Sequence, residues 1–180
     1  TAWGETRVIF MAAFLSWYLV ISILGILVIP LAFRFFPKLP DRGYALLRPL
    51  GLLMWGFVFW LLGSLGILQN NQGGQVAAFL IVAGASIWLG YPVRKEIIHW
   101  FTNHWKSVAV VEVLFLILFA GWTIVRAVDP TISGTEKPME MAFISSILRS
   151  EGFPPADPWL SGYAISYYYF GYVMVAMLAR

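Results

Sequence analysis

The chain alternates long apolar stretches, most of them uncharged, with short polar segments. Five stretches have, or come close to, the roughly 20 apolar residues that a helix needs to cross the hydrocarbon core of a bilayer. They are residues 8–33, 49–68, 76–93, 108–128 and 160–179. This pattern predicts an all-α, polytopic integral membrane protein with about five transmembrane helices.

The polar segments divide the chain into three regions. Residues 1–128 are expected to form four leading transmembrane helices joined by basic loops. Residues 129–160 form an acidic loop, and residues 161–180 hold the fifth span. The sequence begins with Thr1 rather than Met and ends at Arg180, directly after an apolar stretch. We therefore expect it to be a fragment of a longer polytopic chain.

Composition supports a membrane protein, because 60% of the residues are hydrophobic and only 12% are charged. The formal net charge is +3, but the basic residues are spread over short loops and form no dense stripe. We therefore expect no nucleic-acid partner. The chain has no cysteine, so disulfide bonds and thiolate metal sites are excluded.

Basic residues also predict the orientation in the membrane. If the spans alternate, eight of the twelve basic residues lie on one side of the bilayer. By the positive-inside rule this side is cytoplasmic, which makes residues 129–160 extracytoplasmic in a multi-pass protein of the cell membrane. The eight are Arg34, Lys38, Arg42, Arg48, Arg94, Lys95, Lys106 and Arg180.

Residues 94–107 mix apolar and polar side chains, which is typical of a short helix lying at the membrane interface. His99 and His104 in this segment are five residues apart, whereas two ligands on one helical face are four apart. Packing at the interface therefore explains these histidines better than metal binding. Glu112 in the following span is expected to be structural, within reach of Lys106 or lipid headgroups.

The acidic loop concentrates the groups that are able to do chemistry. Five of the nine acidic residues lie between residues 129 and 157. A carboxylate at a membrane surface can take a proton from a sugar or protein hydroxyl, or hold a divalent cation against a lipid phosphate. Each acid alone also fits a solvated loop charge, and Asp129 fits an ion pair with Arg126. Spacing does not choose among these alternatives.

Within the loop, the sequence predicts one amphipathic helix on the outer membrane surface. Pro138 suits its first turn and Gly152 its far end. Four apolar residues recur at helical spacing and define its apolar face: Met139, Ala142, Phe143 and Ile147. The following segment FPPADPWLSG is not helical, because its prolines interrupt a helix, and Trp159 in it fits an interface anchor.

Three consecutive tyrosines begin the last apolar stretch. On a helix, successive residues are about 100 degrees apart, so the hydroxyl groups of Tyr167, Tyr168 and Tyr169 would point around most of its circumference. An aromatic belt at the membrane interface and a cavity for a polar substrate both fit this pattern.

The segments GTEKPMEMAF, FPPADPW and LSGYAISYYYFGY resemble the YYY membrane-protein family, which takes its name from the tyrosine triplet. That family is grouped by similarity with the GT-C glycosyltransferases. The resemblance covers residues 129–173 and implies a GT-C-like helical fold. It also implies transfer of a sugar from a polyprenyl-phosphate carrier at the extracytoplasmic face, with an acidic residue of an outward loop as base or metal ligand.

Carried over to this chain, the resemblance makes Glu136 and Glu140 the expected catalytic residues and Asp129 a third candidate. Members of the family often have Asp at the position of Glu140. The resemblance implies one possible cofactor, a divalent cation, and does not assign its ligands. Lys137 and Arg149 are expected to meet a phosphate. The sugar pocket is expected to be lined by Asp157, Trp159, Tyr167, Tyr168 and Tyr169.

Two other classes of function compete with a glycosyltransferase. A non-catalytic scaffold or accessory subunit would use close helix contacts with membrane-protein partners, for example at Gly84, Ala85 and Ser86. A transporter is disfavoured, because no span has an ionisable group near its middle. Whether the protein is an enzyme therefore stays open, and the bilayer is the one partner that every alternative shares.

Overall fold

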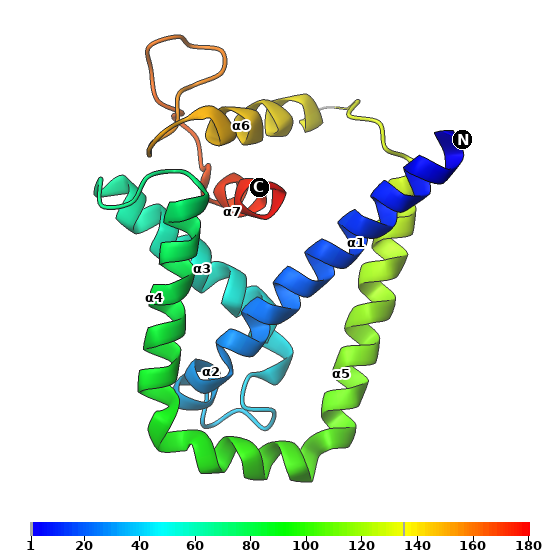
Figure 1. The fold of residues 1–180 in the computed structure, drawn as a ribbon, viewed down its shortest axis with the longest axis vertical. Coiled ribbons are helices and arrows are strands. Elements are labelled where there is room, and N and C mark those ends of the chain that lie inside the picture. The colour runs from blue at the N-terminus through cyan, green and yellow to red at the C-terminus, as the bar shows by residue number, and fades with distance from the viewer. Residues whose placement is uncertain (1, 135) are drawn as a thin grey trace. The chain divides into compact units, whose positions relative to one another are not determined.

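The computed structural model describes residues 2–134 and 136–180, with side chains from residue 10 onward (Figure 1). Helices make up nearly all of its regular structure, and within the described residues one isolated bridge, between Ala156 and Ala164, is the only β pairing. The elements are α1 (Ala2–Leu27), α2 (Ile29–Phe35), η1 (Tyr44–Leu46), α3 (Leu47–Ser64), α4 (Gln72–Gly90), η2 (Tyr91–Val93), α5 (Arg94–Val128), α6 (Lys137–Arg149) and α7 (Phe170–Ala179).

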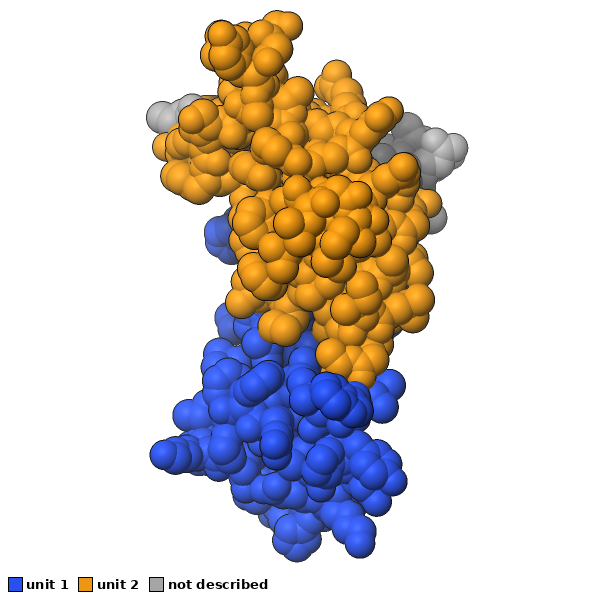
Figure 2. Space-filling view, turned by 90° about the vertical axis from the view of Figure 1, so that its left-hand side faces the viewer, with its two compact units in different colours: residues 1–51, 86–131 blue, residues 52–85, 132–180 orange. Residues whose placement is uncertain are grey.

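The chain divides into two compact units, coloured separately in Figure 2. Unit 1 contains Thr1–Gly51 and Ser86–Thr131, and unit 2 contains Leu52–Ala85 and Ile132–Arg180. Two boundaries fall inside α3 and α4, and the third follows α5, between Thr131 and Ile132. Nearly all of the acidic loop belongs to unit 2, so that unit carries most of the predicted site.

Three helical stretches are long and apolar enough to cross a membrane: Phe10–Leu27, Tyr44–Ser64 and Gln72–Val128. The first two overlap the first two predicted spans, although the structure divides residues 8–33 at Val28 into α1 and α2 and ends α3 at Ser64. The third combines the predicted third and fourth spans, because α4 continues through the short helix η2 into α5. The all-helical membrane fold is therefore confirmed, whereas a count of five spans is not.

Helix α5 bends at His104, whose φ of −116° and ψ of 19° are not helical (Figure 1). The predicted interfacial helix at residues 94–107 is confirmed as a helix and forms the part of α5 before and across this bend. Trp100 is buried there against Phe33 and Tyr44. The His104 ring stacks on Trp100, with ring centroids 4.8 Å apart. The structure thus gives His104 a packing role.

Unit 1 is held together by close helix contacts and by the ion pairs Arg42–Glu96 and Arg48–Glu112. A Cβ atom at Gly51 of α3 would lie 2.2 Å from the Leu24 carbonyl oxygen of α1, so only glycine allows this approach. Arg48 Nη1 donates a hydrogen bond to Glu112 Oε1 on α5 over 3.1 Å, and Tyr44 donates to the same oxygen over 2.7 Å. Glu112 is structural, as predicted, but its partner is Arg48 rather than Lys106.

The predicted fifth span is wrong over its first half. Residues 160–169 form turns and irregular backbone, and α7 begins only at Phe170. Pro155 and Pro158 precede this segment, and Gly162 has a φ of +87° that turns the chain away from a helix. The ten residues of α7 cover about 15 Å, half the thickness of the hydrocarbon core.

The predicted position of Arg180 is also wrong. Alternating spans predict Arg180 on the opposite side of the bilayer from the turn before α4 and from the acidic loop. In unit 2, its guanidinium contacts Asn70 in that turn and Leu148 at the end of α6. The cause is the short helix α7, which runs beside α6 and does not lead away from it (Figure 1).

Candidate functional site

The two favoured catalytic carboxylates lie at the start of α6. The predicted amphipathic helix is confirmed here, with Glu136 at the residue before its first turn, Pro138 in that turn and Glu140 one turn later. The Glu140 amide donates to the Glu136 carbonyl over 2.9 Å. Residues four apart share a helical face, and negative charge is favourable near a helix N-terminus. The backbone therefore presents both carboxylates on the same side of α6.

That side of α6 packs on an aromatic cluster centred on Phe143, which is 4% exposed. Its ring centroid lies 5.5 Å from that of Trp159, 5.6 Å from Tyr167 and 5.5 Å from Tyr172. The apolar face predicted for this helix thus packs against α7 and the preceding loop. Ring pairs at such distances stabilise a packed cluster, so these aromatic side chains are held in place.

Tyrosine hydroxyls lie within electrostatic reach of both carboxylates. Tyr167 donates a hydrogen bond of 2.6 Å to the Tyr168 hydroxyl, and the two rings stack with centroids 3.9 Å apart. This bond is the main reason why the pKa of Tyr167 is raised to about 12, and the charge of Glu136 adds to it. The charge of Glu140 acts on the Tyr172 hydroxyl. We call these five residues the carboxylate–tyrosine cluster.

The tyrosine triplet does not lie on a helix, contrary to the prediction. Tyr167 and Tyr168 precede α7, and Tyr169 is the residue just before its first turn. The three side chains lie in two different regions. Tyr167 and Tyr168 belong to the carboxylate–tyrosine cluster, whereas the Tyr169 hydroxyl accepts a hydrogen bond of 3.1 Å from Trp60 Nε1 on α3.

Asp157 holds the loop between α6 and α7. Its Oδ1 atom accepts hydrogen bonds from the amides of Trp159 and Leu160, over 2.8 and 2.9 Å. This is the local turn that aspartate side chains favour. The turn leaves the Trp159 side chain 62% exposed next to Phe143. Of these two residues expected in the sugar pocket, Trp159 faces solvent and Asp157 shapes the backbone.

Not all of the predicted site residues lie together in unit 2. Asp129 lies in unit 1, where its Oδ1 atom accepts hydrogen bonds from the amide and hydroxyl of Thr131. Lys137 opens α6 next to Glu136. Arg149 lies in the last turn of α6, about 14 Å along the helix axis from Glu140. Only Lys137 of the two expected phosphate ligands is therefore near the carboxylates.

The described residues offer few metal ligands close to one another. Within residues 2–134 and 136–180, no group of three or more His, Asp or Glu side chains is placed to hold a metal ion. Glu136 and Glu140 alone supply two carboxylates, fewer than the oxygen ligands that Mg²⁺ or Ca²⁺ takes. The residues present do not make up a metal site.

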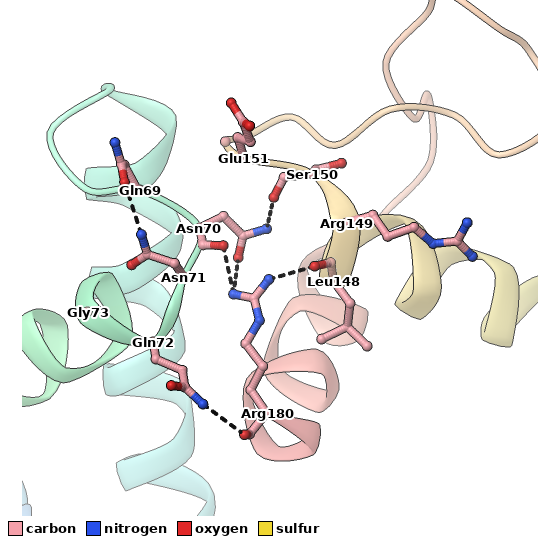
Figure 3. A pocket seen from close by; sticks show the side chains of 11 residues that line it. Gln69, Asn70, Asn71, Gln72, Gly73, Leu148, Arg149, Ser150, Glu151 and Arg180 are labelled. Atoms are coloured by element: carbon pink, nitrogen blue, oxygen red, sulfur yellow. Dashed lines mark hydrogen bonds between the residues drawn. The ribbon is translucent and has the colours of Figure 1, made fainter.

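A second feature lies at the other end of α6. A polar hollow of about 1020 Å³ opens between the turn before α4 and the C-terminal ends of α6 and α7 (Figure 3). Its centre is Asn70, which is only 5% exposed. The residues that line it are Gln69, Asn70, Asn71, Gln72, Gly73, Leu148, Arg149, Ser150, Glu151, Gly152 and Arg180.

Asn70 and Arg180 close the end of α6. Asn70 Nδ2 donates to the carbonyls of Ile147 and Ser150, over 2.6 and 2.8 Å. Arg180 Nη2 donates to the Leu148 carbonyl over 2.9 Å, and its Nη1 donates to Asn70 Oδ1 over 2.9 Å. The last carbonyls of a helix lack partners within the helix, so this clamp satisfies them from two other segments.

Sequence reasoning missed Tyr172, Asn70 and Arg180. Tyr172 comes three residues after the triplet, inside an apolar stretch that gave it no separate signal. Asn70 lay in the QNNQGG segment, which only predicts a turn. Arg180 was used as a topological charge. Nothing in the local pattern indicates that the three residues meet α6.

The protein is a helical membrane protein. It has helical stretches able to span a bilayer, and a polar segment joins α5 to α7. Residues 54–180, well over half of the chain, match the family described as "Uncharacterized membrane protein (DUF2298)". The chain belongs to this family. The matched region contains α4 to α7, and with them the carboxylate–tyrosine cluster and the polar hollow. The chain matches no curated protein and no solved structure.

Proposed function

We propose that this membrane protein is a glycosyltransferase of GT-C type, which transfers a sugar from a polyprenyl-phosphate carrier at the extracytoplasmic face of the cell membrane. One observation carries the proposal. Two carboxylates, Glu136 and Glu140, share one side of α6 with the tyrosine hydroxyls of the cluster. Carboxylates beside fixed hydroxyl donors are suited to moving a proton from a substrate hydroxyl.

In this proposal Glu140 is the general base. Its side chain is half-buried, whereas Glu136 is exposed. The acceptor hydroxyl gives its proton to the Glu140 carboxylate as its oxygen forms a bond to the anomeric carbon of the sugar. The bond between that carbon and the phosphate oxygen breaks, and polyprenyl phosphate leaves with the electron pair. Glu136 and Lys137 lie at the N-terminal end of α6, where Lys137 contacts the phosphate of the polyprenyl carrier.

The aromatic side chains of the cluster would bind the sugar. Tyr168 and Trp159 are 75% and 62% exposed, so their rings and polar atoms are available to a ligand. The hydroxyl of Tyr167 is already oriented toward Tyr168, which leaves the Tyr168 hydroxyl as a donor. The outward position of residues 129–160 follows from the positive-inside rule and is part of the proposal.

The test is sugar transfer in membranes that contain the full-length protein, with a panel of labelled polyprenyl-phosphate sugars. We expect Glu140→Gln to lower the transfer rate at least about a hundredfold, the size of a general-base contribution. Glu140→Asp should retain part of the rate, because it keeps the carboxylate. Glu96→Gln is the control, since it removes a carboxylate of unit 1 that is 44% exposed and forms an ion pair with Arg42. Unchanged transfer by Glu140→Gln would reject the assignment.

A non-catalytic scaffold is the second candidate, and one observation favours it. Around Gly84 on α4, no other atom lies within 4 Å of the position that a Cβ would take. This leaves the surface at Gly84 open to another helix. If assembly is the function, Gly84→Leu should disrupt complexes with partner helices and leave the fold intact. A glycosyltransferase should keep its transfer rate with the same change.

A further inference from the structure

We propose that the polar hollow at the C-terminal end of α6 binds a neutral saccharide, as a second site separate from the carboxylate–tyrosine cluster. The proposal rests on the proposed function, because it assigns the hollow to the saccharide that accepts the sugar. It starts from the chemistry of the lining, in which amide groups predominate and only Leu148 presents an apolar side chain.

The charge of Arg180 is already compensated by hydrogen-bond acceptors within the fold. Its guanidinium donates to the carbonyls of Asn70 and Leu148 and to the Asn70 side chain. The carbonyl end of a helix carries partial negative charge, so the C-terminus of α6 compensates this cation. Burial lowers the pKa of Arg180, but its charge persists at neutral pH. Arg180 therefore forms the floor of the hollow and is not an available anion ligand.

The remaining polar atoms of the hollow alternate between donors and acceptors. Gln69 Oε1 accepts a hydrogen bond from Asn71 Nδ2 over 2.9 Å, which leaves the Gln69 amide N–H groups available. Gln72 Nε2 reaches the Arg180 carbonyl at 3.4 Å, which leaves its Oε1 as an acceptor. A sugar hydroxyl both donates and accepts a hydrogen bond, so adjacent amide donors and acceptors match it.

Two charged side chains complete the rim. Arg149 and Glu151 both line the hollow, and in the described part of the chain neither side chain makes a hydrogen bond or an ion pair. In Figure 3 the Arg149 guanidinium points away from Arg180, and the Glu151 carboxylate lies above Asn70. The two guanidinium groups thus do not converge on a common point. A phosphate would need such convergence and would meet Glu151, whereas a neutral polyol needs neither.

The position of the hollow defines the kind of saccharide. Leu148 lies eight residues after Glu140, which is about 12 Å along α6. A ligand that reaches both the hollow and the carboxylates must contain more than one sugar unit. The structure therefore predicts an oligosaccharide acceptor, free or linked to a lipid, with its reacting end near α7 Tyr172 and an internal unit in the hollow.

The test measures binding without transfer. The full-length protein is purified in a detergent without a sugar headgroup, since a maltoside would compete for the site. Its binding to neutral hexasaccharides of glucose, mannose, galactose and N-acetylglucosamine is measured by calorimetry. We expect at least one to bind, and Gln69→Ala with Gln72→Ala to weaken it about tenfold through two lost hydrogen bonds. Asn103→Ala removes an exposed amide in unit 1 and should have no effect.

The outcomes separate this proposal from the proposed function. If Glu136→Gln with Glu140→Gln abolishes transfer but keeps hexasaccharide binding, both proposals stand. Binding without any transfer by the wild type would support the hollow and count against the enzyme. No binding across the panel, equal binding by the amide double variant, or preferential binding of inorganic phosphate would overturn the saccharide site, even if transfer occurs.

Discussion

Asn70 and Arg180 are 110 residues apart in sequence, yet Arg180 Nη1 donates hydrogen bonds to both oxygens of Asn70, over 2.8 and 2.9 Å (Figure 3). Between them they satisfy three carbonyls at the end of α6. The turn before α4, helix α6 and helix α7 are therefore joined at one buried point, and the polar hollow is built on that point.

Removing the Asn70 side chain should destabilise unit 2. Asn70→Ala leaves the carbonyls of Ile147 and Ser150 without their donor, and Arg180 without one acceptor. We expect a loss of roughly 2–4 kcal/mol in the free energy of unfolding, measured by denaturation in mixed micelles. Asn103→Ala should stay within about 0.5 kcal/mol. Equal stability of Asn70→Ala and the wild type would contradict the clamp.

The ion pair between Arg48 and Glu112 should behave as a buried pair. The Arg48 side chain is 12% exposed and that of Glu112 is 38% exposed. Glu112→Gln leaves a buried cation without its counter-charge and should cost about 2–3 kcal/mol, less than a fully buried pair. Replacing both by Arg48→Met and Glu112→Leu should recover most of this loss. A double variant that is much less stable than Glu112→Gln would refute this account.

Two glycines of the membrane helices should respond in opposite ways to alanine. The Cβ atom of Gly51→Ala would collide with the Leu24 carbonyl and should cost roughly 1–3 kcal/mol. Gly84→Ala has open space and a better helix former. We expect it to be neutral or slightly stabilising. Thermal unfolding of both variants in one detergent checks the contrast, which equal losses would contradict.

Tyr167 should ionise at a higher pH than an ordinary tyrosine. Its pKa is raised from 10.0 to about 12, because its proton is held by the hydrogen bond to Tyr168. The neutral form is thus favoured in the folded state. This contribution to stability is complete below pH 10 and is lost as the pH rises toward about 12. In absorbance titrations that follow tyrosinate formation, Tyr168→Phe should shift the transition of Tyr167, near pH 12 in the wild type, to lower pH.

The sequence predicted the features that depend on local pattern. Apolar length identified the helices α1, α3, α4 and the later part of α5, and Pro138 with the spacing of Phe143 and Ile147 identified α6. It also placed Glu140 in the first turn of this helix and Glu136 just before it, where the structure has them. These predictions succeeded because helix geometry follows directly from short-range spacing.

The rest depends on contacts that local pattern does not encode. Apolar residues 160–169 have the composition of a span, but Gly162 and the Asp157 turn keep them irregular. Arg180 was assigned to the cytoplasmic side because the fifth stretch was expected to cross the bilayer, while its actual partners lie more than 30 residues away in sequence. Tyr172 reaches the candidate site only because α7 lies beside α6.

The central claim is that Glu136 and Glu140 catalyse sugar transfer. The most direct measurement compares wild-type protein with Glu136→Gln, Glu140→Gln in membranes supplied with labelled polyprenyl-phosphate sugars. The account predicts transfer by the wild type and its loss in the double variant, at equal amounts of folded protein in the membrane. Equal transfer by both proteins, or none by folded wild type across the donor panel, would contradict it.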